Sequence, residues 1–530
     1  MSLNEIKRAF LVGLTVLVLS GLAATGASAQ ASNIYITPDG GGSGVCTNNV
    51  HPLSWLDNGG NWGNGAAQIG SGTTVHLCGT FTSGFTARGS GAPGNPITFL
   101  WETGAKFSAP VWKGVWIILD YQHDIVLDGG GAGGTNGIIE NTANGSPSGV
   151  ESDAIRGLGM GNVEVKNLLI RNMYQHTSVN DNSSTDRNHV CMYINFPQAN
   201  STISIHHNVM HDVNWCIDIS QFTNPGVTVN VYNNEIYNAD HGMALEGDQQ
   251  QPSYTVNFHD NWLHDFANWD STWNSYHHDG IHIYTGDGIR NFWNNKFSGD
   301  CGHNCNTWVY EEGMQGGPHD GNFPGGSQTW FNNVWLGNNR VIGNAFAFIT
   351  GEATFYNNTF VCADTNPSDN FEAFFYNHGT GYYNPIKHNL TFENNVVTGC
   401  VSFLWTDLAM LDAFDYNAYS AAIAGGNNAW TWNGSGTNSF STWRVITSKE
   451  SHSSYSATSG LDANGIPQAG SSAIGAGANL SGLGIAALNR DKNGVPRPGS
   501  GPWSAGAFAS SSSASNQAPN PPSGLRIVVQ

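Results

Sequence analysis

Carboxylate and imidazole side chains are concentrated in the middle of this chain. A short apolar stretch recurs there, and alternation along each copy separates inward-facing from outward-facing positions. The outward positions and the starts of the same stretches carry Asp218, Asp240, His241, Glu246, His277, His278, Asp279, His282, Tyr284 and Glu311. Side chains of these types on one surface can donate and accept protons, so the cluster predicts an active site. The alternative is a polar sheet face that is simply solvated.

Aligning the copies predicts two outward columns. The first contains Tyr193, Asp218, Ala244, His282, Val309 and Ala347; the second contains Asn195, Ser220, Glu246, Tyr284, Glu311 and Ile349. The apolar residues between them, such as Ile217 with Ile219 and Trp308 with Tyr310, are expected inside. The ionisable members fall on three or four neighbouring copies, and the flanking copies carry Ala, Val or Ile.

Two reactions that cleave glycosidic bonds fit these residues. In a hydrolase, Glu246 and Glu311 would lie two repeats apart, roughly 9–10 Å, near the separation of about 6.5–9.5 Å that an inverting acid and base need. Asp218 with Glu246 is the alternative pair. In an elimination, His282 or His278 would be the base, and Asp218, Glu246 or Asp279 would hold calcium against a uronate carboxylate. Calcium is therefore a candidate cofactor, although the sequence establishes none.

Substrate binding is assigned to Tyr284, His241, His278, Trp269 and Trp273. The two tryptophans lie in an inserted loop that directly precedes "HHDGIHI". Indoles offer platforms for sugar rings, although each ring could equally pack on its own loop. A non-catalytic protein that binds or adheres to glycans would use the same surface, and it is the alternative to an enzyme.

The elements that must position these side chains are stacked coils. An apolar residue, two further residues and an Asn precede a second strand-like stretch in copy after copy. The Asn residues are Asn208, Asn234, Asn261, Asn295, Asn333, Asn358 and Asn395. Successive Asn residues are 25 to 38 residues apart, and such steps with alternating patterning indicate a solenoid whose loops vary in length. We expect the seven amides to bond to one another in one buried column.

Several motifs resemble those of a known group of proteins. These are "GAPGNPITF" at Gly91–Phe99, "VEVKNLLIRN" at Val163–Asn172, the Asn column and the ending Ser471–Ala509. Together they resemble secreted proteins of the pectin-lyase-like superfamily, which implies an all-β, right-handed parallel β-helix. "HHDGIHI" is similar to part of a strand motif of polygalacturonase-like hydrolases, but the paired-Asp, Gly-His-Gly and Arg-Ile-Lys motifs of that family are missing. The resemblance therefore implies a fold and leaves the reaction open.

The first residues resemble a secretory signal. Lys7 and Arg8 precede an apolar run, and Ala27-Ser28-Ala29 has the form of a cleavage site. We divide the chain into a signal peptide (1–29), an N-terminal cap with the first coils (30–119), a parallel β-helix (120–509) and a flexible Ser- and Pro-rich tail (510–530). We expect a secreted monomer, extracellular or at the cell surface, with no membrane span. A net charge of −20 argues against nucleic acid as a partner and leaves an extracellular polysaccharide.

Eight cysteines in an exported chain are expected to pair. Matched positions in adjacent coils predict Cys191 with Cys216 and Cys362 with Cys400. Cys46 with Cys78 would close the N-terminal cap. Cys301 and Cys305 remain, and in "CGHNC" a local disulfide is favoured over a metal site.

Overall fold

The computed structural model describes residues 32–42, 44–131, 136–143, 152–173, 190–246, 254–266, 278–283, 288–299, 305–311, 327–337, 344–348, 352–362, 374–376, 390–406, 408, 411–421 and 428–509. No helix within these residues is long and apolar enough to cross a membrane. The described residues contain the α-helix α2 (Phe440–Thr447) near the C-terminal end and the short 3-10 helices η1 (Leu53–Trp55), η2 (Gly59–Asn61), η4 (Ser481–Leu483) and η5 (Ala486–Asn489).

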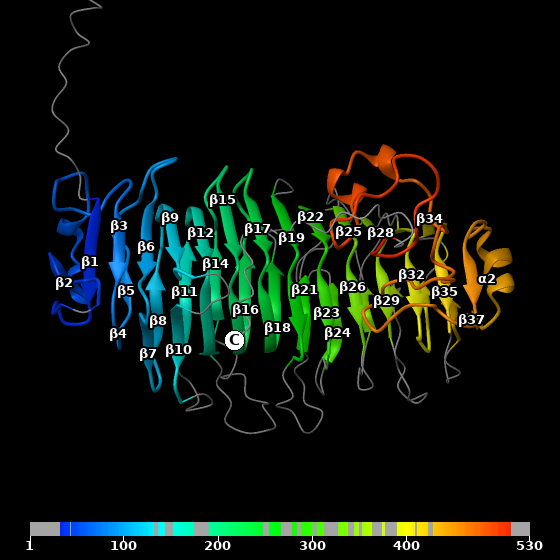
Figure 1. The fold of residues 1–530 in the computed structure, drawn as a ribbon, viewed down its shortest axis with the longest axis horizontal. Helices are drawn as coiled ribbons and strands as arrows, with labels where there is room; N and C mark the ends of the chain where they lie inside the picture. Colours follow the sequence, from blue (N-terminus) through cyan, green and yellow to red (C-terminus); the bar gives the residue numbers. More distant parts are fainter. Residues whose placement is uncertain are drawn as a thin grey trace, which may run out of the picture.

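The described strands form two long sheets along a solenoid (Figure 1). The 14-stranded sheet contains β2 (Val50–Pro52), β1 (Asn33–Thr37), β3 (Thr74–Leu77), β6 (Ile97–Trp101), β9 (His123–Asp128), β12 (Gly161–Lys166), β15 (Thr202–His206), β17 (Thr228–Tyr232), β19 (Thr255–His259), β22 (Ile289–Trp293), β25 (Ser327–Phe331), β28 (Glu352–Tyr356), β31 (Leu390–Glu393) and β34 (Leu411–Asp415). Each strand pairs with the strand one coil away, which confirms the expected parallel β-helix.

The second sheet has 24 strands. They are β4 (Thr80–Phe81), β5 (Phe85–Thr86), β7 (Lys106–Ala109), β8 (Gly114–Ile118), β10 (Gly137–Asn141), β11 (Ser152–Leu158), β13 (Leu168–Met173), β14 (Val190–Asn195), β16 (Val209–Ser220), β18 (Glu235–Glu246), β20 (Trp262–His264), β21 (His278–Ile283), β23 (Lys296–Ser298), β24 (Cys305–Glu311), β26 (Val334–Leu336), β27 (Asn344–Phe348), β29 (Thr359–Val361), β30 (Phe374–Tyr376), β32 (Val396–Thr398), β33 (Leu404–Thr406), β35 (Ala418–Ser420), β36 (Trp430–Trp432), β37 (Ser435–Thr437) and β38 (Ser454–Ser456). Its named strands pair in parallel except for β36 with β37.

A buried column of asparagines links the coils at the bend between the sheets. Each Nδ2 donates to the Oδ1 of the next Asn at 3.0–3.4 Å, from Asn208 through the other six expected residues to Asn417. The residue before each Asn has a left-handed backbone, with φ of 53° to 61°, and Asn, Asp and His, which occupy all but one of these positions, tolerate this conformation best. The expected column is confirmed. Asn417 extends it, and "FDYNAY" carries the same signal.

The interior of the coils is filled by stacked apolar side chains. One stack of rings runs through Phe258, Phe292, Trp330, Phe355, Phe392 and Phe414, with neighbouring centroids 3.8–6.1 Å apart. Ile217, Ile219, Met243, Leu245, Ile281 and Ile283 are buried as expected. Burial of apolar surface between coils therefore fixes which face of each strand points outward.

The cysteines correct one expected pairing. Disulfides join Cys46 to Cys78 and Cys362 to Cys400, as predicted. Cys191 and Cys216 are buried and free, so the predicted bridge between them is wrong. The two residues do lie opposite each other on β14 and β16. Stacking on adjacent coils is therefore not sufficient for a disulfide, although Cys362 and Cys400 do form one at a Cα separation of 4.9 Å. Cys301 lies outside the described residues, and of Cys305 only the backbone is described.

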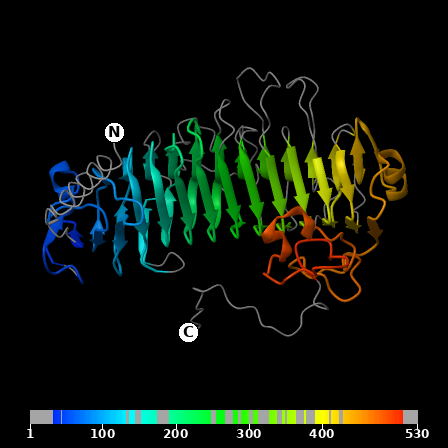
Figure 2. The ribbon, with the colours of Figure 1, turned by 90° about the horizontal axis from the view of Figure 1, so that it is seen from above.

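The last described residues leave the coils and pack against one side of the solenoid (Figure 2). Leu480, Leu488 and Trp503 form an apolar cluster with Phe331 of β25. Asn394, which precedes the ladder residue Asn395, donates to the carbonyl of Ala478. This segment therefore joins several coils that are otherwise linked only to their neighbours.

Candidate functional site

Strands β16, β18 and β21 place two polar columns side by side on the outside of the second sheet. Trp215, His241 and Asp279 form one column, and Asp218, Ala244 and His282 form the other. Asp279 and His282 are three residues apart on β21, so strict alternation would place them on opposite faces. The contact between their side chains shows that they lie on the same face. The register thus brings His282, which alternation had placed outward, together with His241 and Asp279, which were predicted at the start of the strands.

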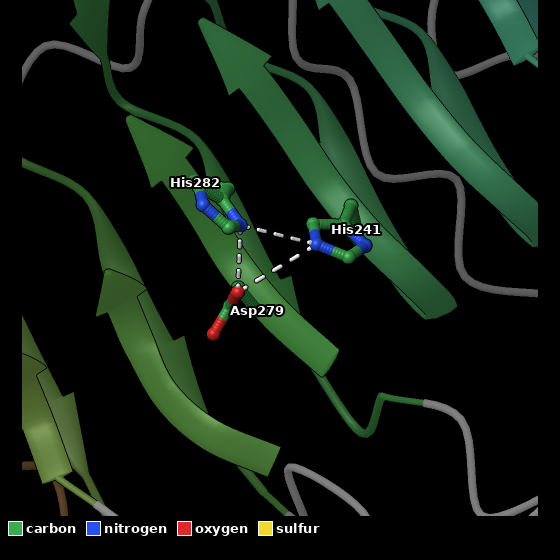
Figure 3. A group of neighbouring side chains, drawn as sticks. All are labelled: His241, Asp279 and His282. Atoms are coloured by element: carbon green, nitrogen blue, oxygen red, sulfur yellow. Dashed lines mark hydrogen bonds and ion pairs between the residues drawn. The ribbon is translucent and has the colours of Figure 1, made fainter. Parts of the chain in front are cut away.

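His241, Asp279 and His282 converge on one point (Figure 3). Asp279 Oδ2 is 3.0 Å from His282 Nδ1 and 3.6 Å from His241 Nε2, and the two ring nitrogens are 3.3 Å apart. All three residues are buried: His241 is 5% exposed, Asp279 0% and His282 1%. The neighbouring Asp218 is 8% exposed. Buried groups of this kind interact more strongly with one another than they would in water.

A second carboxylate holds the far side of His241. Asp240 Oδ2 lies 2.8 Å from His241 Nδ1, and Asn214 Nδ2 donates to the same oxygen at 3.5 Å. Burial lowers the pKa of His241, and the nearby Asp240 opposes this effect only in part. His241 is therefore a neutral imidazole at neutral pH, with Nδ1–H donated to Asp240 and the lone pair of Nε2 facing His282 and Asp279.

Two glycines allow the strands beneath the cluster to approach closely. A Cβ on Gly242 would lie 2.4 Å from the carbonyl oxygen of Gly280, and a Cβ on Gly280 would lie 2.5 Å from that of Trp308. Any side chain at either position would push the strands apart. Glycine is thus required next to His241 and Asp279, and it fixes the distance between the two side chains.

The predicted columns are wrong at β24. Asp279 pairs with Thr307, but the preceding pair is His278 with Cys305, so β24 contains one extra residue at this point. Tyr310 consequently lies opposite His282, where Val309 was expected, and Glu311 lies opposite Ile283. Glu246 pairs with Ser220 as predicted. Glu246 and Glu311 therefore do not share a column, because a one-residue irregularity shifts every later position of the strand.

The remaining predicted residues are described only in part. For Glu246, His278 and Glu311 the structure describes the backbone, and Tyr284, Trp269 and Trp273 lie outside the described residues. Their roles stay predictions. The sequence pattern placed Asp240, His241 and Asp279 at the entrance to the strands and did not predict the direct contact of His241 and Asp279 with His282. Aligning "DHGMALE" with "HDGIHI" through their glycines places His241 opposite Asp279, but it does not indicate the contact with His282.

The arrangement has two chemical uses. Each imidazole is paired with a carboxylate, which is the arrangement of an oriented general acid or base. The same donor atoms form the one group of three or more His, Cys, Asp or Glu side chains in the described residues that could hold a metal ion.

Fold and site define a parallel β-helix protein whose central coils carry a buried His/Asp cluster. No protein-family model and no curated relative matches the chain. Among solved structures, that of pectate lyase Pel9A is similar over 92% of this chain and 98% of its own, at 15% identity and a TM-score of 0.36. The function is therefore inferred from the side chains of this chain.

Proposed function

We propose that this protein cleaves glycosidic bonds of an extracellular polysaccharide at the face formed by β16, β18 and β21. The observation that carries the proposal is the pair of adjacent, buried imidazoles, each held by a carboxylate: His241 by Asp240 at 2.8 Å and His282 by Asp279 at 3.0 Å. Such pairs suit proton transfer. A sheet of stacked coils also offers an extended surface along which a polymer can lie.

An extracellular location is supported by the disulfides Cys46–Cys78 and Cys362–Cys400, because such bonds persist in oxidising compartments. The sequence features of residues 1–29 agree with export. An extracellular substrate follows from this location, and the indoles and hydroxyl groups predicted around the cluster suit a carbohydrate.

Elimination is favoured over hydrolysis. A base removes the proton on the carbon beside a uronate carboxyl group, a carbon–carbon double bond forms as the glycosidic C–O bond breaks, and the leaving oxygen takes up a proton from water or from the protonated base. His282 oriented by Asp279 can be that base. Inverting hydrolysis needs two carboxyl groups about 6.5–9.5 Å apart across the scissile bond. The pair first assigned to it, Glu246 and Glu311, does not share a column. Asp218 stays available as a second proton-transfer or substrate-binding group.

The test is incubation with a panel of neutral and acidic polysaccharides, measuring both reducing ends and the absorbance of unsaturated uronates. Elimination gives both signals. His282→Ala should lower the rate about 10²-fold or more, whereas His264→Ala should not change it. His264 is a matched control because it also contacts two carboxylates, Glu235 and Asp265, but on β20.

Other outcomes would each contradict part of the proposal. Reducing ends without absorbance would replace elimination by hydrolysis, and Glu246→Gln and Glu311→Gln would then identify the acid and the base. Binding to a glycan on the panel without any product would favour the non-catalytic alternative. Full activity in His282→Ala would show that the reaction takes place elsewhere on the molecule.

A further inference from the structure

We propose that His241, Asp279 and His282 bind one divalent transition-metal ion of the zinc type. This goes beyond the proposed cleavage and does not depend on it, because a metal site can be catalytic or structural. The argument rests on the distances between the three donor atoms, their lone pairs, the support behind His241 and the chemical nature of the donors.

The separations of the donor atoms match those around a small metal ion. His241 Nε2, His282 Nδ1 and Asp279 Oδ2 are 3.0, 3.3 and 3.6 Å from one another. Ligands about 2.0–2.1 Å from a tetrahedral zinc ion are about 3.3–3.4 Å apart. The observed separations bracket this value. An ion at the centre of the triangle, displaced to one side of its plane, could contact all three atoms without a change of strand register.

Lone pairs converge within this triangle. Donation of Nδ1–H to Asp240 directs the lone pair of His241 Nε2 toward the other two atoms. A hydrogen on His282 Nδ1 can point to Asp279 or to His241, but not to both. A proton can therefore lie on only one edge of the triangle, whereas a cation can contact all three donor atoms at once.

His241 has the carboxylate contact on its second ring nitrogen that is typical of metal-bound histidines. Such a histidine normally donates its second ring N–H to a carboxylate or carbonyl, which fixes its tautomer and orientation. Asp240 supplies this contact at 2.8 Å and is itself held by Asn214. The close approach of Gly242 to Gly280 fixes the strand spacing beneath the site. The site is thus positioned by backbone and by outer side chains before any ion arrives.

The donor types select the class of metal. Two imidazole nitrogens and one carboxylate oxygen suit zinc, iron, nickel or copper. Calcium takes six to eight oxygen ligands, so this group does not fit the calcium ion suggested by the sequence. Three protein ligands would leave at least one position for a solvent or substrate oxygen. With a metal bound, His282 is a ligand rather than a base, and Asp218, one strand beyond Ala244, remains for proton transfer.

The test uses the full chain, treated with a chelator and then titrated with Zn²⁺ alone and with Ca²⁺ alone. We expect one Zn²⁺ retained per chain after gel filtration, visible d–d bands when Co²⁺ is substituted, and no calorimetric signal from Ca²⁺ at this site. His282→Ala and His241→Ala should lose the ion, while His264→Ala retains it. Asp240→Asn should keep one ion per chain with about 10–100-fold lower affinity.

Two results would overturn the proposal. One is a wild-type chain that retains no Zn²⁺ or Co²⁺, and the other is equal retention in wild type and in both His variants when circular dichroism shows them folded. If a His variant fails to fold, Asp240→Asn together with the Co²⁺ spectrum of the wild type decides the question. All of these readouts measure binding, so they remain valid if the protein cleaves no glycan. Loss of cleavage in a chelator, restored by Zn²⁺, would join the two proposals.

Discussion

A histidine next to an aspartate is not by itself a sign of chemistry in this protein. Four dipeptides place His Nδ1 2.6–2.8 Å from the following Asp: His123-Asp124, His211-Asp212, His259-Asp260 and His264-Asp265. In each one the Asp has a left-handed backbone, with φ of 48° to 55°, so these pairs stabilise bends. Asp240-His241 has the reverse order and no such bend, and it is buried. Its contact with a second His/Asp pair distinguishes it from the other four.

Glu450 is the buried acid that ends the asparagine column. It accepts hydrogen bonds from Asn417 and Tyr419 and contacts Ser453. Burial raises its pKa above the ordinary 4.5 despite these bonds. Between 4.5 and the raised pKa the folded state therefore binds more protons than the unfolded state, and the free energy of unfolding falls as pH rises through this window.

Glu450→Gln should remove that fall, because the amide cannot ionise. Denaturant unfolding between pH 4 and pH 8 measures it. Glu164 is a control because its pKa shifts in the opposite direction. Hydrogen bonding to His206 is the main cause that lowers the pKa of Glu164 to about 2. Its contribution is present above pH 4.5 and is lost as pH falls toward 2, so Glu164→Gln should weaken the protein at neutral pH. An unchanged slope in Glu450→Gln would contradict the assignment.

At the scale of strands, the features that recur in every coil could be predicted from the sequence, whereas local departures from the repeat could not. The asparagine column could be foreseen because every coil needs the same buried amide at the same bend. The position of Glu311 could not, because one extra residue in β24 leaves no trace in an alternating pattern. The contact of His282 with Asp279 has a similar origin. It depends on a local break in alternation beside Gly280. Glycine is required there because the carbonyl oxygen of Trp308 lies where a Cβ would be, and this neighbour is known only from the structure.

Gly242 connects the strand geometry to the site. A Cβ at this position would meet the Gly280 oxygen at 2.4 Å and side-chain atoms of Leu263 and Phe266 at 3.0 Å. Gly242→Ala should cost about 1–3 kcal/mol of stability and weaken zinc retention by separating β18 from β21. Denaturant unfolding and metal analysis measure the two effects. Gly482→Ala is the control, because nothing lies within 4 Å of its Cβ. Equal stability of both variants would show that β18 can move freely.

At the scale of the molecule, contacts between adjacent coils are supplemented by the segment that folds back along the solenoid (Figure 2). Asn332 donates to the carbonyl of Arg490, and Asn357 donates to those of Ser504 and Gly506. Arg497 in turn donates to Asn332. These bonds join the bends before β26 and β29 to residues about 150 positions later. The C-terminal half therefore has a long-range restraint in addition to the nearest-neighbour contacts of a solenoid.

Trp503 is the residue on which this restraint can be tested. It is buried with Phe331, Leu480 and Leu488, and the guanidinium of Arg497 lies 5.4 Å from its ring. Trp503→Ala should cost about 3–5 kcal/mol. Hydrogen exchange should then rise in β25, β28 and β31 and stay unchanged in β3, β6 and β9, because loosening is transmitted only through adjacent coils. Leu483→Ala, an exposed change in the same segment, should leave all six strands unchanged.

Zinc retention at β18 and β21 measures whether the effect of Trp503→Ala reaches the site. We expect the variant to retain zinc, because the apolar cluster around Phe331 lies on coils that follow those two strands in the chain. Uniformly faster exchange from β3 to β31 would instead show that the solenoid opens as one cooperative unit and that the folded-back segment stabilises all of it, including the site.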